Sequence, residues 1–408
     1  MLLLFLLYCI FLVYFFKTYS MSRRGAVLLA MIIYLLITLL DLGFLCKLGR
    51  PFHISDPSDY YYNTVNLTFS QLFKLEGTNT FYNIINWYYN HVFDNPYVIS
   101  LFIKLDNILV ILIAYLLITG ELEDFGASDL ILLFNPYLLV TISHNVRDAY
   151  IILFVSMVLV GMGCFRETGR KNLYLIIGLL LLCITRKILL VVFAIIALMA
   201  LIRKNRRWIY VVVPVVGIVL FMFWNQIIAA MIKQAISAME FVNEDTSDFA
   251  EMMENQYSIS TLFLLFKRFG IGFVSLLLTP HPVNFFNQWI ANADSMGTYG
   301  IYTAFDNVMI VIGAIYSYIF ILPVLFEYFA EYKTNNQIVF YFILIFIVIY
   351  VIAYLGITDI RNRHIIFFFI LADYIQQKKE FSLKTNGRYY MLSMIMFVFI
   401  ALISGNYQ

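Results

Sequence analysis

Residues 173–202 decide the fold: they read LYLIIGLLLLCI (173–184), TRK (185–187) and ILLVVFAIIALMALI (188–202). The two apolar runs hold roughly 12 and 15 residues, about 18 to 22 Å of helix, against a hydrocarbon core of about 30 Å. We therefore expect a short helical hairpin that holds Arg186 at or below the membrane surface. Arg147, within SHNVRD (143–148), interrupts the apolar sequence in the same way.

An arginine in such a position is costly in lipid and should face protein or a water-filled cavity, which makes both residues candidates for a functional site. The simpler interpretation is an arginine at a helix end that reaches out to the membrane interface. Two such arginines on one side of the membrane favour the functional interpretation.

The composition is that of a membrane protein. The 408 residues are 62% hydrophobic and only 13% charged, with a mean hydropathy of +0.85. We therefore expect an all-α polytopic membrane protein. The formal net charge of +2 argues against nucleic acid as a partner. The four cysteines lie in apolar runs without CxxC spacing, which predicts neither disulfides nor metal ligands. The first apolar run lacks a preceding basic region, so we expect a retained helix and not a signal peptide.

Hydropathy predicts about 12 transmembrane helices in a single integral membrane domain over residues 1–408. Lys and Arg collect in four short loops, at 17–24, 166–171, 203–207 and 378–388, which the positive-inside rule places in the cytoplasm, with the N-terminus outside. The predicted spans are 2–19, 25–46, 98–119, 129–143, 149–165, 172–185, 188–202, 208–229, 301–326, 337–356, 358–375 and 389–404.

Two long polar loops, at about 47–97 and 230–300, fall on the outer face of this topology and are too long to be simple connections. The apolar stretch at 261–279 is broken by Lys267-Arg268 and two glycines, and we expect it to lie along the interface or to re-enter the membrane.

The charged residues that could bind a substrate or transfer a proton also fall on the predicted outer face. One guanidinium group can bind two phosphate oxygens at once, and it stays charged when partly dehydrated. Several arginines on one face therefore favour a phosphorylated polyanion as the ligand. The alternative is a set of structural ion pairs at helix ends. The candidate binding residues are Arg147, Arg186, Lys187, Arg268, Arg361 and Arg363, and the candidate acids and bases are Asp56, Asp59, His144, Asp148 and His281.

Familiar catalytic motifs are missing from the sequence. There is no GxxxxGK[ST] loop for nucleotide phosphates, and neither HExxH nor GxSxG is present. The five histidines are scattered and show no metal spacing, so we expect no metal and no cofactor.

The chain resembles the Wzy-type polymerases of bacterial O-antigen and capsular repeat units and the related EpsG-like exopolysaccharide proteins. The resemblance covers nearly the whole chain, although each motif is short. In the hairpin region, where EpsG-like proteins tend to have a histidine, this chain has Thr185-Arg186-Lys187. The resembling motifs are Asp56-Pro57-Ser58-Asp59-Tyr60, Asn145-Val146-Arg147-Asp148, Ile184-Thr185-Arg186, Lys267-Arg268 with Pro280-His281-Pro282, and Asp359-Ile360-Arg361-Asn362-Arg363.

The resemblance implies a metal-independent glycosyltransferase in the bacterial cytoplasmic membrane. Its substrate would be an oligosaccharide on undecaprenyl pyrophosphate, transferred at the outer face to a hydroxyl of the next lipid-linked unit. Arginines would stabilise the leaving pyrophosphate, and an acidic residue or a histidine would take the proton of the hydroxyl. A flippase and a chain-length regulator are the expected partners.

Three alternatives remain at this stage. A GT-C-type glycosyltransferase would use a polyprenyl-phosphate sugar, with Asp56 or Asp59 as its acidic residue. A flippase for lipid-linked glycan would show inverted repeats, which the sequence lacks. A membrane O-acyltransferase would need a His–Arg pair within the helices, and none is evident.

Overall fold

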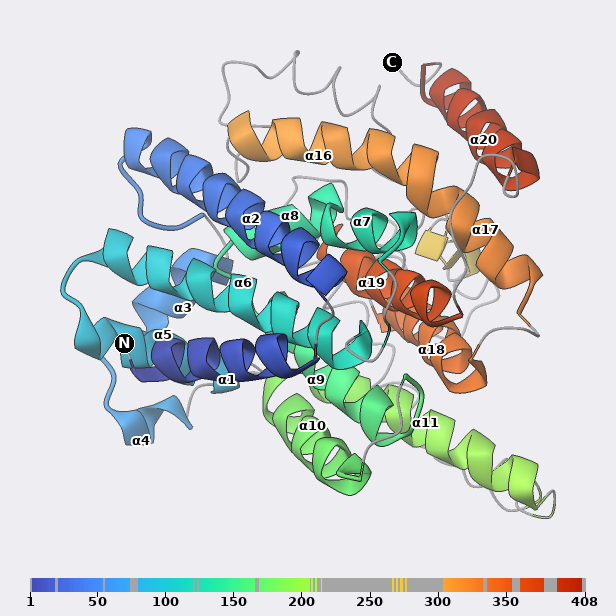
Figure 1. Cartoon of the computed structure of the whole chain (residues 1–408), viewed down its shortest axis with the longest axis horizontal. Helices are drawn as coiled ribbons and strands as arrows, with labels where there is room; N and C mark the ends of the chain where they lie inside the picture. The colour runs from blue at the N-terminus through green and yellow to red at the C-terminus, as the bar shows by residue number, and fades with distance from the viewer. Residues whose placement is uncertain are drawn as a thin grey trace, which may run out of the picture. The chain divides into compact units, whose positions relative to one another are not determined.

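The structure is a computed structural model, and in the part of the chain that it describes all regular secondary structure is helical (Figure 1). Its helices follow the predicted spans closely over most of that part. The described residues are 2–18, 21–53, 56–73, 80–119, 122, 125–165, 169–205, 207, 210, 214, 266–267, 269–270, 272–273, 276, 304–332, 336–353, 360–377 and 387–405.

The helices of the first half of the chain are α1 (Leu2–Thr18), α2 (Met21–Lys47), α3 (Asp56–Thr64), α4 (Phe69–Leu72), α5 (Thr80–Val92), α6 (Pro96–Thr119), α7 (Ala127–Leu133), α8 (Pro136–Ser143), α9 (Asp148–Gly161), α10 (Lys171–Thr185) and α11 (Lys187–Lys204). Those of the second half are α16 (Ala304–Tyr316), the π-helical turn η2 (Ser317–Ile321), α17 (Leu322–Ala330), α18 (Gln337–Ala353), α19 (Ile360–Gln376) and α20 (Gly387–Gly405).

Three of these helical segments are long and apolar enough to cross a membrane. They are Arg23–Lys47, Pro96–Thr119 and Phe305–Ala330, the last of which runs through α16, η2 and α17. Most of the other apolar helices are shorter, and α9 and α10 are among them. The structure ends α10 at Thr185 and begins α11 at Lys187, so the helix is interrupted at Arg186 as predicted. Neither an α10–α11 hairpin nor a count of twelve spans is established by it.

The predicted span at 129–143 is not one uninterrupted helix, because the structure divides it into α7 and α8. Pro136 starts α8, where its missing N–H costs no helical hydrogen bond, and Asn135 caps the helix by accepting from the Tyr137 N–H at 3.0 Å. A proline at this point separates two helices that hydropathy alone reads as one.

The first predicted outer loop contains regular structure. Between α2 and α6 it contains three helices, of which α5 is amphipathic and turns Tyr82, Ile85 and Tyr89 towards the interior. The Trp87 indole donates to the Leu67 carbonyl at 2.7 Å and ties α5 back to the segment before α4. The three helices therefore pack together through α5, which in turn packs on α6 and α10.

A proline also explains the π-helical turn in the third long segment. Pro323 cannot donate to the preceding turn, and the chain passes through η2 immediately before it. Within this turn, the Tyr318 carbonyl accepts a hydrogen bond from the Ser393 hydroxyl at 2.5 Å, which holds α20 against η2.

The chain divides into two compact units. The first comprises residues 1–190, 280–339 and 367–408, and the second comprises residues 191–279 and 340–366. Within the first unit α6 is the central helix, since it packs against α1, α2, α5, α8 and α9 (Figure 1).

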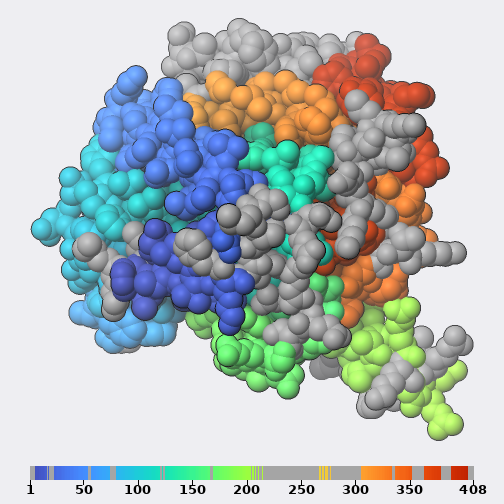
Figure 2. Space-filling model, in the orientation of Figure 1, coloured from blue at the N-terminus to red at the C-terminus, as the bar shows by residue number. Residues whose placement is uncertain are grey.

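Burial confirms the central place of α6. In its most apolar window 78% of the residues are buried, against 28% for α2. One face of α1 and of α2 (blue in Figure 2) lies at the surface, and large side chains exposed there, such as Phe5, Leu36 and Leu40, are apolar as a lipid-facing surface requires.

One end of the first unit is closed by a buried ion pair. The Arg23 guanidinium lies 3.5 Å from the Asp129 carboxylate, and it donates to the Thr119 carbonyl at 3.2 Å. Tyr115 donates to the same carboxylate at 2.5 Å. This network joins the start of α2, the end of α6 and the start of α7, at the end that the basic loops predict to face the cytoplasm.

Candidate functional site

A buried cluster of five charged or ionisable side chains lies towards the opposite end of the first unit. Its members are Asp41, His53, Lys104, His144 and Asp306, and none of them is more than 8% exposed. They come from α2, the segment after it, α6, the end of α8 and α16. Because burying charge is costly, a set of this size is expected to be paired, and it is.

Lys104 anchors the first half of the cluster. Its Nζ donates to Asp41 Oδ2 at 2.7 Å and also to the Ser143 carbonyl at the end of α8. On the other side of Asp41, His53 Nε2 lies 3.0 Å from Asp41 Oδ1. One carboxylate therefore joins an ammonium group to an imidazole.

Asp306 completes the cluster between two histidines. His144 Nε2 lies 2.7 Å from Asp306 Oδ1, and His53 Nδ1 lies 3.2 Å from Asp306 Oδ2. The two imidazole rings stack on one another, with centroids 3.8 Å apart and planes 19° apart. Each ring thus faces the same carboxylate from one of its nitrogen atoms.

The two histidines, which lie outside the long spans, differ in protonation. Burial acts to lower the pKa of His53, but the carboxylates of Asp41 and Asp306 outweigh it and raise that pKa to about 9. Burial, together with the positive charge on His53, lowers the pKa of His144. With Lys104 and His53 positive and both carboxylates negative, the charges of the cluster balance.

Hydrogen bonds hold the backbone that presents His144. The Asn107 amide donates to the His144 carbonyl at 2.9 Å. Asn145 donates to the Ser100 carbonyl at 2.9 Å, and Ser100 returns a bond to the Asn145 side chain at 3.1 Å. The turn between α8 and α9 is therefore fastened to α6 at its histidine and at the residue that follows.

Arg147 follows this turn and stands at the start of α9 as its N-cap. Its Nη1 is buried, yet it donates to no acceptor in the described part of the chain. The neighbouring Asp148 is also buried, and no ion pair joins the two among the residues that the structure describes. The guanidinium is thus not neutralised by its neighbour. It stands beside the first N–H groups of a helix, a combination with the chemistry to bind an anion.

The packing of α9 on α10 determines where Arg186 lies. A Cβ atom on Gly161 would lie 2.6 Å from the Leu175 backbone nitrogen, and one on Gly178 would lie 2.8 Å from Val158 Cγ2. These two close approaches fix the antiparallel register of the helices. Continued along the helices, this register brings Arg186, at the end of α10, level with the first turn of α9.

The three predicted residues Arg147, Asp148 and Arg186 consequently lie at the same end of one hairpin. Arg186 is only 9% exposed, whereas Lys187 beside it is exposed. The Lys187 side chain is therefore more exposed than those of Arg147 and Arg186.

Behind this end of the hairpin lies a wall of tyrosines from α5 and α9. Tyr89 donates to Asp106 Oδ2 at 2.6 Å, and the Tyr150 hydroxyl lies 3.5 Å from the same oxygen. Burial raises the pKa of Tyr82, and neighbouring Tyr60 and the carboxylates of Asp106 and Asp148 add to the effect. Asp148 thus faces a polar interior and not the lipid.

The structure does not establish the other predicted site residues as members of this group. Asp59 is exposed on α3. Arg363 belongs to the second unit, where it is buried and donates from Nε to the Leu276 carbonyl at 2.7 Å. The side chains of Asp56 and Arg361, and the whole of Arg268 and His281, lie outside the described residues.

Asp41, His53, Lys104 and Asp306 were not among the predicted site residues. A signal for two of them was present in the sequence, since Asp41 and Lys104 interrupt apolar helices. An ionisable residue within a membrane span is a functional candidate by default. Asp306 lies in the predicted span 301–326, but close to its start, where polar residues are common, and His53 lies between helices and had no such signal.

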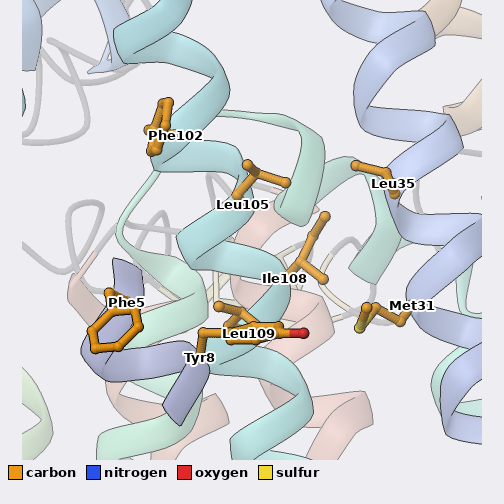
Figure 3. A pocket seen from close by; sticks show the side chains of 8 residues that line it. All are labelled: Phe5, Tyr8, Met31, Leu35, Phe102, Leu105, Ile108 and Leu109. Atoms are coloured by element: carbon orange, nitrogen blue, oxygen red, sulfur yellow. The ribbon is translucent and has the colours of Figure 1, made fainter. Parts of the chain in front are cut away.

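An apolar cavity of about 360 Å³ opens on the other side of α6 (Figure 3). Phe5 and Tyr8 of α1, with Met31 and Leu35 of α2, form two of its walls. The third wall is one face of α6, formed by Phe102, Leu105, Ile108 and Leu109, and Lys104 points away from that face into the cluster.

Comparisons of the chain with models of protein families, with curated proteins and with solved structures gave no match in any of the three.

Proposed function

We propose that the chain polymerises oligosaccharide repeat units carried on a lipid pyrophosphate, at the outer face of a membrane. The observation that supports this most is the buried Arg147 Nη1, which donates to no acceptor in the described part of the chain. An unpaired guanidinium nitrogen in a protein interior is costly, so a ligand that supplies oxygen acceptors would be strongly favoured.

The neighbourhood of Arg147 suits a pyrophosphate. Arg186 is level with it across the α9–α10 hairpin, and the first turn of α9 adds its unbonded N–H groups. Two guanidinium forks and a helix N-terminus can bind several phosphate oxygens together. The short helices keep this end of the hairpin near the membrane surface, where a lipid-anchored phosphate group travels.

Asp148 is the base that we assign to the reaction. It is buried beside Arg147 and makes no ion pair among the described residues, whereas His144 Nε2 is already engaged with Asp306. The acceptor hydroxyl gives its proton to the Asp148 carboxylate, and its oxygen bonds to the anomeric carbon of the donor glycan. The bond from that carbon to the pyrophosphate breaks, and Arg147 with Arg186 stabilises the departing phosphate charge.

Deletion of the gene in its host, followed by analysis of lipid-linked and surface glycan, tests the proposal. A missing polymerase leaves complete single repeat units on the lipid carrier, exposed outside. A missing flippase leaves none exposed, and a missing GT-C-type transferase leaves units that lack one sugar. Return of the wild-type chain restores polymer, and return of an Arg147→Ala chain does not. A deletion strain with polymer of normal length would refute the proposal.

A further inference from the structure

His53, His144 and Asp306 form a group that ion pairing alone does not account for. One ligand atom from each of the three residues lies within 4.8 Å of the others, and all three residues are buried. They come from three distant parts of the chain, so no spacing in the sequence could have revealed them. Two imidazole nitrogens and one carboxylate are a donor set that divalent transition metals favour in proteins.

The second observation is a buried nitrogen that lacks a hydrogen bond. His53 is only 2% exposed, and its Nδ1 makes no hydrogen bond, although it lies within ion-pair distance of Asp306 Oδ2, at 3.2 Å. A buried imidazole nitrogen with no hydrogen bond is costly. A bond to a metal ion would satisfy that nitrogen.

The outer neighbours of the group have the arrangement that metal-binding histidines usually show. A ligating histidine commonly donates its other ring N–H to a carboxylate, which fixes the ring and strengthens it as a ligand. His53 Nε2 lies 3.0 Å from Asp41 Oδ1, and Lys104 in turn donates to Asp41 Oδ2 at 2.7 Å. Lys104 balances the charge of Asp41, so Asp41 is a supporting residue and not a ligand.

We propose that His53 Nδ1, His144 Nε2 and the Asp306 carboxylate bind one divalent transition-metal ion, for which Zn²⁺ is the best match. For both nitrogens to point at one ion at about 2.0–2.1 Å, the stacked rings must turn apart, since an ion cannot lie in the planes of two parallel stacked rings. The ion takes over the charge that a protonated His53 otherwise supplies opposite Asp306.

Such a metal ion would support the proposed phosphate site at Arg147 by holding the backbone next to it. It would join α16 to the turn between α8 and α9 and to the segment after α2. His144 precedes Arg147 by three residues, and the intervening Asn145 is bonded to Ser100. The ion would therefore hold the backbone that presents Arg147. In this role His53, His144 and Asp306 position Arg147 and are not themselves catalytic.

The test uses the full-length chain purified in detergent. Zinc content is measured by mass spectrometry for the wild type and for His53→Gln, His144→Gln and Asp306→Asn variants. His91→Gln is the matched control, because His91 is exposed on α5 and bonds only to the Trp87 carbonyl among the contacts that the structure gives it. We expect one zinc ion per chain in the wild type and in the control, and loss of zinc in the three site variants.

A second measurement does not depend on whether the variants fold. Addition of Co²⁺ to metal-stripped wild-type chain should give visible absorption bands of four-coordinate cobalt, which Zn²⁺ then removes, and Zn²⁺ should raise the unfolding temperature of that chain. Absence of zinc, of the cobalt bands and of a temperature shift in the wild type would overturn the proposal. Retention of zinc by a His53→Gln/His144→Gln double variant would overturn it equally. Neither result would bear on the polymerase assignment, which rests on Arg147 and Arg186.

Discussion

Lys104 and Asp41 form an ion pair of 2.7 Å between two long apolar helices, α6 and α2, and both side chains are fully buried. Each residue lies about two helical turns inside its helix, so neither can reach water by extending along the surface. The pair therefore fixes how α2 and α6 align, and through Asp41 it also holds His53.

Loss of one member of this pair should be far more damaging than loss of both charges. Lys104→Met or Asp41→Asn leaves the buried cluster with one uncompensated charge and should each lower the free energy of unfolding by about 3–5 kcal/mol. The double variant should recover much of that loss, because the charges of the remaining His53 and Asp306 balance. Unfolding in detergent, analysed as a double-mutant cycle, gives the coupling directly. Additive effects of the two substitutions would contradict the pairing.

A second prediction about stability follows from the close packing of α9 on α10 at Gly178. Gly178→Ala places a methyl group 2.8 Å from Val158 Cγ2 and 3.0 Å from the Phe154 carbonyl oxygen, so the two helices must move apart. We expect a loss of about 1–3 kcal/mol, seen as a lower unfolding temperature.

Gly43→Ala is the matched control for that substitution. Gly43 also lies inside a helix, but a Cβ atom there would meet nothing within 4 Å. Alanine at this position should leave stability unchanged or raise it by up to about 1 kcal/mol, because glycine is the poorer helix former. Equal losses at both positions would show that the close packing at Gly178 has no special role.

The positions of the helices could be predicted from hydropathy, because each membrane-length apolar run must bond its backbone internally. Hydropathy did not reveal the interruption at Pro136, where a single imino acid splits an apolar run, or the helices within the first outer loop. That loop packs through α5, whose apolar face follows helical periodicity and is too polar overall to count as a span.

The site could be predicted only in part. Arg147, Asp148 and Arg186 stand out because each interrupts short apolar runs, and the structure brings all three to one end of a hairpin. The link from His53 through Asp306 to His144 could not be predicted, because nothing in a single sequence relates positions so far apart. Lys104 and Asp41 each signalled a buried charge in an apolar helix, but not the identity of the partner.

Arg186 should need its planar side chain and not only its charge. Arg186→Lys keeps a cation but loses the fork that binds two phosphate oxygens together, so polymer formation should fall at least about tenfold. Arg388→Lys is the control, since the Arg388 side chain is 71% exposed and pairs only weakly with Glu331 at 3.5 Å. Polymer length is read from glycan gels of a deletion strain that carries each variant at equal protein level. Full activity of Arg186→Lys would show that charge alone suffices there.

Arg147 gives the sharpest prediction, because its buried Nη1 has no acceptor among the described residues. If a ligand phosphate supplies that acceptor, Arg147→Ala should abolish polymer while the chain remains in the membrane at its normal level. The same substitution should not lower the unfolding temperature of the ligand-free protein by more than a few degrees, since no ion pair is lost within the described part of the chain. Removal of Arg23, which is paired with Asp129, should instead destabilise the fold. An Arg147→Ala chain that is active but unstable would make this arginine a structural residue and remove the main support for a pyrophosphate site.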